Sequence, residues 1–221
     1  MDDVRANLER VRERVARAAQ RAGRRPQDIL LIGVSKTVPA ERVRQAVEAG
    51  VAALGENRVQ EAKEKIRTVG HPVPWHLIGH LQTNKVKDAL ELFDVIQSVD
   101  RLPLAAELAR RARRRVDVFV EVNLAGEPAK SGFAPAEVKP ALDALAALPN
   151  LRVRGLMAIP PAAADAEQAR PWFRALRDLR DAAGLPELSM GMSADFEVAI
   201  EEGATMVRVG TAVFGPRPTR P

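Results

Sequence analysis

Short apolar runs alternate along this chain with longer stretches in which apolar residues recur at helical spacing. Residues 3–22 place Val4, Leu8, Val11 and Val15 on one face, which predicts an amphipathic helix. Residues 28–35 (DILLIGVS) are almost wholly apolar, which is typical of a strand buried on both faces. The same patterns predict strands at residues 51–55, 75–79, 95–99, 116–122, 151–159, 188–190 and 205–209, and helices at residues 39–49, 59–69, 84–92, 102–114, 135–148, 165–183 and 195–202.

The strict alternation of strands and helices predicts an α/β fold with parallel strands and right-handed crossovers. Eight such units favour a single closed (β/α)8 barrel of the TIM type. An open doubly wound sheet stays an alternative at this point, because strand order cannot be read from a sequence. The chain has 221 residues, of which 46% are hydrophobic, so it can fill one core, and we expect a single domain over residues 1–221.

Composition narrows the classes of protein that fit this pattern. No run of about 18 apolar residues occurs, so no membrane-spanning helix is expected. The charged N-terminal segment lacks the apolar core of a secretory signal. The chain contains no cysteine, which excludes disulfides and thiolate chemistry and favours a cytoplasmic protein.

The net charge is +5, and the densest basic run is formed by Arg110, Arg111, Arg113, Arg114 and Arg115. Such a run is typical of an anion-binding or nucleic-acid-binding surface, or of a solvated helix end where arginine favours the helix dipole. No aromatic residue lies within the run to stack on bases. We therefore favour the helix end and expect no nucleic-acid partner.

In a barrel of this kind, functional residues lie at the carboxyl ends of the strands, and Lys36 stands at the end of the first one. In a structural role, this lysine reaches solvent or pairs with a carboxylate such as Glu56. In a chemical role, it is a Schiff-base nucleophile, which must lose its proton and so profits from partial desolvation. From this strand alone the two interpretations are equally good.

Other strand ends also carry candidate residues, although each is weak evidence alone because strand ends need polar caps in any case. His76 lies inside the third strand and is interpreted as a core histidine, and His71 as a loop residue. Three histidines without metal-ligand spacing predict no metal site. The candidate residues at the rim are Glu56, Asn57, His80, Gln82, Gln97, Ser98, Glu121, Asn123 and Met157.

The ends of the seventh and eighth strands are more informative. Gly191, Met192 and Ser193 precede a helix with Asp195 in its first turn. A helix start with a nearby glycine and hydroxyl binds phosphate well, although Ser193 can also be an ordinary N-cap. Residues 208–211 (RVGT) close the eighth strand, and barrels frequently hold a phosphate between these two loops.

A phosphate site at strands seven and eight would lie beside Lys36, across the seam at which the barrel closes. A compact ligand that carries both an aldehyde and a phosphate would bridge the two features. Pyridoxal 5′-phosphate is such a ligand. Phosphorylated sugars, the substrates of Schiff-base aldolases, also qualify.

Seven segments of the chain are shared, in the same order, with one known family. Together they resemble the pyridoxal phosphate homeostasis protein family over about residues 28–215. The combined pattern is specific, although no single tetrapeptide is. The segments are VSKT (34–37), GENRVQE (55–61), WHLIGHLQTNK (75–85), KSG (130–132), RGLMAI (154–159), MGMSADF (190–196) and VRVGTAVFG (207–215).

The resemblance implies a barrel like that of alanine racemase, of fold type III among pyridoxal phosphate proteins, without a C-terminal β domain. It implies that the cofactor is bound as a Schiff base on Lys36, and that Ser193, Gly210 and Thr211 contact the phosphate. Arg208 would lie near either the ring nitrogen or the phosphate. The full set of expected cofactor-binding residues is Lys36, Asn57, Met192, Ser193, Arg208, Gly210 and Thr211.

Three positions depart from the family pattern. Arg58 stands where tyrosine is frequent, His80 where some bacterial members have proline, and residues 124–126 where serine or threonine is usual. None of these departures touches Lys36 or the expected phosphate contacts. The cofactor assignment therefore stands, while Arg58 changes the charge of the rim.

Two classes of protein now compete: a carrier that stores pyridoxal phosphate or delivers it to dependent apoenzymes, and a racemase-like or decarboxylase-like enzyme. Racemisation needs a base on each face of the substrate; the second base of the racemases is a tyrosine, and this chain has none. The related enzymes also use a further β-rich domain, for which 221 residues leave no room. An Arg208 that faces the ring nitrogen would weaken the cofactor as an electron sink. We therefore expect a monomeric carrier without catalytic residues, rather than an efficient enzyme.

Overall fold

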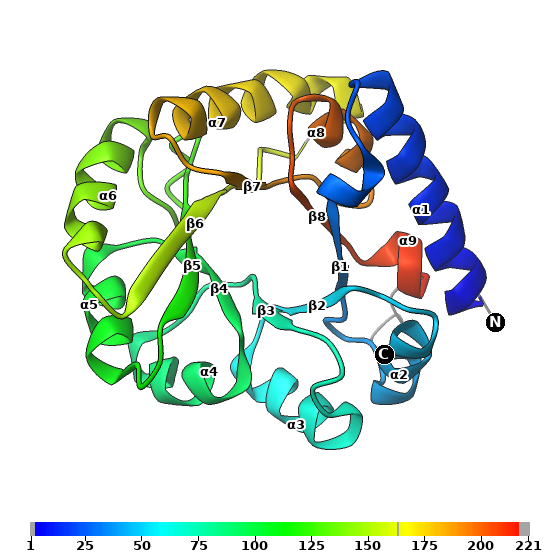
Figure 1. The fold of residues 1–221 in the computed structure, drawn as a ribbon, viewed down its shortest axis with the longest axis horizontal. Helices are drawn as coiled ribbons and strands as arrows, with labels where there is room; N and C mark the ends of the chain where they lie inside the picture. Colours follow the sequence, from blue (N-terminus) through cyan, green and yellow to red (C-terminus); the bar gives the residue numbers. More distant parts are fainter. Residues whose placement is uncertain (1–2, 163, 217–221) are drawn as a thin grey trace.

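The computed structural model describes residues 3–162 and 164–216, whose strands form a closed parallel barrel. The strands follow one another in chain order, and β8 pairs with β1 to close the ring (Figure 1). The predicted barrel is thus confirmed, and the open sheet is excluded. The strands are β1 (Leu30–Val34), β2 (Ala53–Glu56), β3 (Trp75–Leu77), β4 (Val95–Val99), β5 (Val116–Glu121), β6 (Leu151–Met157), β7 (Glu187–Ser189) and β8 (Met206–Val209).

Helices surround the barrel on its outside (Figure 1). Their apolar faces pack against the outward side chains of the strands, so that most strand positions are buried on both faces. The α-helices are α1 (Val4–Arg21), α2 (Ala40–Glu48), α3 (Val59–Val69), α4 (Val86–Leu92), α5 (Leu102–Arg111), α6 (Val138–Ala146), α7 (Arg170–Ala182), α8 (Phe196–Glu201) and α9 (Thr211–Phe214).

Several predicted boundaries were wrong by a few residues. The predicted helices at 84–92, 135–148 and 165–183 each begin instead with a turn of 3-10 helix: η2 (Thr83–Lys85), η3 (Pro135–Glu137) and η4 (Ala166–Ala169). Such turns are common at helix starts and share the polar pattern of a first helical turn, so the sequence does not separate them. A further turn, η1 (Pro26–Asp28), takes the start of the predicted first strand.

The helix predicted at residues 102–114 ends at Arg111, because Ala112 adopts an extended backbone conformation. Arg110 and Arg111 lie in the last turn of α5 and both pair with Glu107. Arg113 and Arg114 belong to the connection that leads into β5. Only the first part of the basic run is therefore the helix end that the sequence favours.

Helix α1 closes the outside of the barrel at the β8–β1 seam, against α2, α8 and α9. Val4, Leu8, Val11 and Val15 are all buried, as the helical spacing predicts. A buried amide adds a polar link, since Asn7 Nδ2 donates to the carbonyl of Val213 in α9 at 3.0 Å. Helix α1 thus fixes the short helix that directly follows β8.

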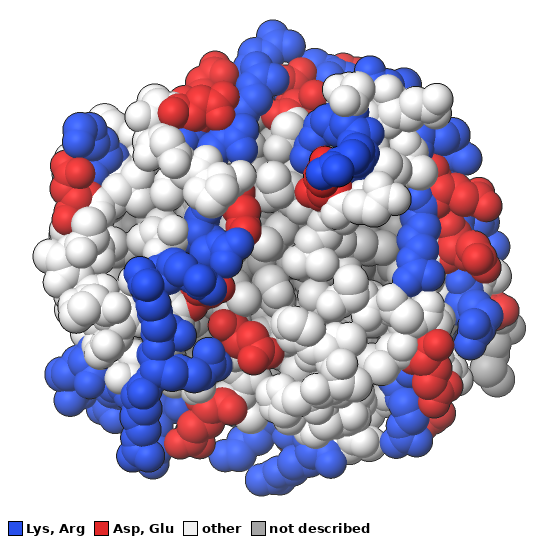
Figure 2. Space-filling view, viewed as in Figure 1, with Lys and Arg blue, Asp and Glu red and all other residues white. Residues whose placement is uncertain are grey.

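Charged side chains cover the outer surface of the barrel. On the face shown in Figure 2, arginine and lysine gather over the side of the molecule that carries α4 and α5, with carboxylates interspersed. Within the described residues, no helix is long and apolar enough to cross a membrane.

Candidate functional site

The structure brings Lys36 together with the end of β8, as the barrel closure predicts. Lys36 is half-buried and lies two residues beyond the last residue of β1. Because β1 pairs with β8, Gly210 and Thr211 lie beside it, and all three residues line one small cavity. The lysine that could act as a nucleophile and the loop that could hold a phosphate therefore share one space.

The loop after β8 presents backbone N–H groups next to this cavity. The N–H groups of Gly210 and Ala212 both point at the hydroxyl of Ser193, at 3.2 and 3.4 Å. A side chain at position 210 would be crowded, because an added Cβ would lie 3.3 Å from the carbonyl oxygen of Val34. Helix α9 then begins at Thr211, whose side chain is exposed. This short helix was not predicted from the sequence.

In the β7–α8 loop the structure excludes the alternative role of Ser193 and corrects the predicted start of the helix at Asp195 by one residue. Ser193 is not an N-cap, because α8 begins later, at Phe196, and the Ser193 hydroxyl reaches across to the β8–α9 loop instead. Asp195 is the N-cap residue rather than a first-turn residue, and its carboxylate accepts from the N–H of Met192 at 2.6 Å. Met192 itself is exposed at the rim.

Arg208 begins a chain of buried polar groups inside the barrel. Its guanidinium donates to Ser189 Oγ at 2.7 Å and to the carbonyl of Ala158 at 2.9 Å. Ser189 Oγ donates to Gln97 at 2.6 Å, and Gln97 Nε2 lies 2.9 Å from His76 Nδ1. Burial lowers the pKa of Arg208 to about 10 and that of His76 to about 4, so at neutral pH the arginine is a cation and the histidine is neutral. His76 is thus a core histidine, as predicted.

Glu121 ends β5, on the part of the rim opposite the β8–β1 seam. Burial raises its pKa to about 7; the charge of Asp100 adds to this effect and that of Arg208 opposes it. Its Oε2 atom is buried and has no hydrogen-bond partner among the described residues. The same Asp100 contacts His80, whose side chain is exposed. The Nδ1 atom of His80 lies 2.8 Å from Asp100 and 3.0 Å from the hydroxyl of Ser131.

Asn57 is half-buried between the ends of β2 and β3. Its Oδ1 atom is buried without a hydrogen-bond partner among the described residues. The chain after β3 packs directly on it, since a Cβ at Gly79 would lie 2.4 Å from the Asn57 carbonyl oxygen. Asn57 also borders a rim pocket of about 410 Å³ that is lined by Arg58, His80 and Lys85.

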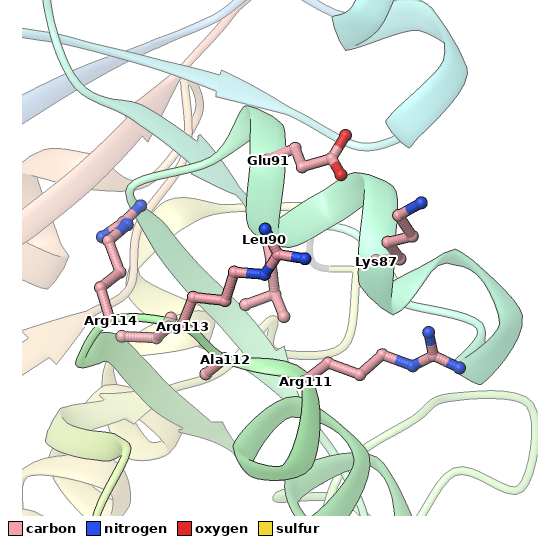
Figure 3. A pocket seen from close by; sticks show the side chains of 8 residues that line it. Lys87, Leu90, Glu91, Arg111, Ala112, Arg113 and Arg114 are labelled. Atoms are coloured by element: carbon pink, nitrogen blue, oxygen red, sulfur yellow. The ribbon is translucent and has the colours of Figure 1, made fainter.

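A separate groove lies between α4 and the connection from α5 to β5, and it contains much of the basic run (Figure 3). Figure 3 shows that the charged ends of Lys87, Arg111 and Arg114 point in different directions. Arg114 donates to the carbonyl of Phe93, and Arg111 pairs with Glu107. The cations therefore do not converge on one ligand position. Within residues 3–162 and 164–216, no group of three or more His, Asp or Glu side chains could hold a metal ion.

A closed parallel barrel with a lysine at its rim is the architecture of one known class of barrel proteins. The family model for the alanine racemase N-terminal domain matches residues 6–218. An alanine racemase from Clostridium difficile has the same fold, with a TM-score of 0.73 and 20% identity; the match covers 99% of this chain and 58% of that one.

More similar proteins narrow the class. The pyridoxal phosphate homeostasis protein of Aquifex aeolicus is 48% identical over 95% of this chain and 96% of its own length. That of Escherichia coli is 42% identical over 98% of both chains. The structure of PipY from Synechococcus elongatus, with PLP bound, has a TM-score of 0.81 and 39% identity, over 91% of this chain and 100% of that one. The chain belongs to the pyridoxal phosphate homeostasis protein family, which confirms the resemblance found in the sequence.

Proposed function

We propose that this protein binds pyridoxal 5′-phosphate covalently, as a Schiff base on Lys36, and acts in intracellular homeostasis of this cofactor as a store or carrier. The observation that carries the proposal is the single cavity shared by Lys36, Gly210 and Thr211. The homologue PipY, which has been solved with PLP bound, supports the same cofactor.

The residues present fit this group. Gly210 lets the loop lie close against Val34 of β1, and its N–H and that of Ala212 point at one acceptor position, at the Ser193 hydroxyl. Backbone N–H groups, the Ser193 hydroxyl and the Thr211 hydroxyl would together hold a phosphate dianion. The buried Oδ1 atom of Asn57 has no partner within the described chain, so it is available to a polar group of the ligand.

The remaining roles follow from the same geometry. When bound, the cofactor supplies an aldehyde carbon that an amine can attack. Lys36 supplies the amine, from a half-buried position at the end of β1. We place Arg208 at the ring rather than at the phosphate, because its guanidinium is held toward Ser189 and Ala158. As a buried cation there, it would keep a neighbouring ring nitrogen from gaining a proton.

The side chains at the rim support a carrier over an efficient enzyme. The sequence has no tyrosine and no cysteine to act as a second base. His80 is engaged with Asp100 and Ser131, and Glu56 Oε1 accepts from Lys65 and Ser35. One described rim carboxylate remains a candidate base. Burial raises the pKa of Glu121 to about 7, which is near neutral pH, where a general base works best. A cation at the ring would also weaken the cofactor as an electron sink.

Colour and chemical trapping test the attachment. We expect the purified protein, after incubation with pyridoxal phosphate, to absorb visible light and to keep the pyridoxyl group after borohydride reduction. Peptide mapping should then place the group on Lys36. A colourless protein would favour a phosphosugar aldolase, and a pyridoxyl group on Lys85 or Lys130 would refute the assignment to Lys36.

Turnover tests the carrier role. We expect L-alanine, L-serine and L-lysine, incubated with the loaded protein in deuterated water, to exchange their α-protons far more slowly than about 1 per second, the low end of ordinary enzymes. Exchange is followed by NMR, and chiral chromatography measures racemisation. Turnover at or above that rate would show that the protein is a racemase-like enzyme rather than a carrier. A Glu121→Gln variant would then test Glu121 as the second base of that enzyme.

We propose that pyridoxal-phosphate-dependent apoenzymes receive the cofactor, that the carrier is a monomer, and that it works in the cytoplasm without a nucleic-acid or membrane partner. Transfer of the cofactor to a colourless apoenzyme is measured with the two proteins in one chamber and with a dialysis membrane between them. Equal transfer in both arrangements indicates release into solution, and transfer only in one chamber indicates direct handover. Light scattering of the loaded protein measures the oligomeric state, and fractionation of cells that express a tagged chain tests the location.

A further inference from the structure

The backbone on the C-terminal side of Lys36 is strained. Thr37 has a φ of 63°, in the left-handed region. Among residues 3–162 and 164–216, it is the only non-glycine residue with a positive φ. A β-branched side chain is disfavoured there, so the conformation persists only if neighbouring groups hold it. Strain of this kind next to a reactive residue indicates that the backbone direction at Lys36 matters.

A carboxylate holds Thr37 in this conformation. Glu61, in the first turn of α3, accepts a hydrogen bond from the Thr37 N–H at 2.5 Å. The Thr37 hydroxyl also donates to the carbonyl of Lys36 at 2.6 Å. Glu61 is in turn paired with Lys65, one helical turn further along α3, at 2.7 Å.

The same lysine holds the residue on the other side of Lys36. Lys65 Nζ donates to the carbonyl of Ser35 and pairs with Glu56 at 2.6 Å. The Ser35 hydroxyl donates to the same Glu56 oxygen at 2.6 Å. One ammonium group therefore connects both residues that flank Lys36 to two carboxylates on β2 and α3.

Stability alone does not account for this cluster. The Lys65 side chain is 8% exposed and that of Glu56 is fully buried, and one Glu56 oxygen lacks a partner among the described residues. Removing such ions from water is costly, and well-packed apolar residues of similar volume are often as stable or more stable. Lys65 lies on the buried face of α3 with Val59 and Ala62, where an apolar residue would continue the pattern. What an apolar residue could not supply is the bond to the Ser35 carbonyl and the ion pair with Glu61, the residue that holds Thr37.

We propose that Lys65 is a positioning residue for Lys36: through Ser35 directly, and through Glu61 and Thr37, it fixes the backbone that aims the Lys36 amine at the aldehyde of the incoming cofactor. The inference rests on the proposed covalent role of Lys36. It adds that the rate at which Lys36 reacts depends on a lysine that does not itself touch the cofactor.

The test compares Lys65→Met with a control variant whose core is weakened away from Lys36. The full chain is freed of bound cofactor with hydroxylamine and mixed with pyridoxal phosphate, and the visible band is followed by stopped flow. We expect Lys65→Met to slow formation of the band by roughly tenfold or more, because small errors in the aim of a reacting group cost large factors in rate. A Phe173→Leu variant, which weakens the core at α7 away from Lys36, should react at the wild-type rate.

A rescue variant separates positioning from folding. Asparagine tolerates the left-handed conformation better than threonine. Adding Thr37→Asn to Lys65→Met should therefore recover part of the lost rate, although it restores no ion pair. If Lys65→Met does not fold, Glu61→Ala removes the bond to Thr37 and the ion pair with Lys65 but leaves Lys65 bonded to Ser35 and Glu56, and it should slow the reaction by roughly threefold.

The outcomes are distinct. Wild-type rates in Lys65→Met, or in Glu61→Ala, would overturn the proposal, as would an equal slowing in the Phe173→Leu control. Failure of the proposed function looks different, because the wild-type chain itself would then develop no visible band.

Discussion

A chain in which alanine replaces Lys36 is expected to lose the visible band completely while keeping its fold. The side chain is half-buried at the end of β1, and the bonds that fix this segment are made by the backbone of its neighbours and by Ser35. Removing the amine removes the covalent link, while these bonds to Ser35 and Thr37 stay in place. Pyridoxal phosphate should still bind weakly through the loop after β8, since the Ser193 hydroxyl and the N–H groups of Gly210 and Ala212 remain.

Absorption spectra, equilibrium dialysis and thermal unfolding measure the three parts of this expectation. Lys85→Ala is the matched control, because Lys85 lines the neighbouring rim pocket and should leave the band unchanged. A visible band in Lys36→Ala, together with a pyridoxyl group that stays on the protein after borohydride reduction, would show that another amine carries the cofactor.

The barrel could be predicted from the sequence because its signals are redundant. Each strand is an apolar run that needs cover on both faces, and each is followed by an amphipathic stretch, so a single misplaced boundary does not change the topology. Closure then places the ends of β1 and β8 side by side without further information. The proximity of Lys36 to Gly210 therefore follows from the number of strands alone. The structure confirms it, because β8 pairs with β1.

The direction of individual side chains could not be predicted in the same way. Ser193 looks like an N-cap because hydroxyls are common before helices, yet it accepts bonds from a loop 17 residues further along the chain. Helix α9 was missed because its four residues are too few to show a helical period. Bonds between distant segments leave no local pattern.

Lys65 was missed for a related reason. Its spacing from Glu61 is that of an ordinary surface ion pair four residues apart, which carries little information. A signal was nevertheless present, because Val59 and Ala62 mark the buried face of the helix and Lys65 continues it. A lysine on the apolar stripe of a helix, near a strand that ends in a candidate nucleophile, is a pattern worth searching for elsewhere.

A chain that carries both Ser193→Ala and Thr211→Ala is expected to bind pyridoxal phosphate at least about 100-fold more weakly. The double change removes two hydroxyls that would contact a phosphate dianion, and hydrogen bonds to charged groups are worth about 1.5–3 kcal/mol each. In the structure, the Ser193 hydroxyl also accepts from the N–H groups of Gly210 and Ala212, so it orders the loop that presents them. The dissociation constant is measured from the visible band during titration.

The comparison with pyridoxal, which lacks the phosphate, makes this prediction specific. Pyridoxal should bind the unaltered chain poorly, and the double change should alter its affinity little, because the lost contacts are made to the phosphate alone. Ser98→Ala is the matched control: its hydroxyl is buried on β4 without a hydrogen-bond partner among the described residues, so its removal should leave both affinities unchanged. An equal loss of affinity for pyridoxal and for its phosphate ester would move the phosphate away from the β8–α9 loop, because only a contact to the phosphate can distinguish the two ligands.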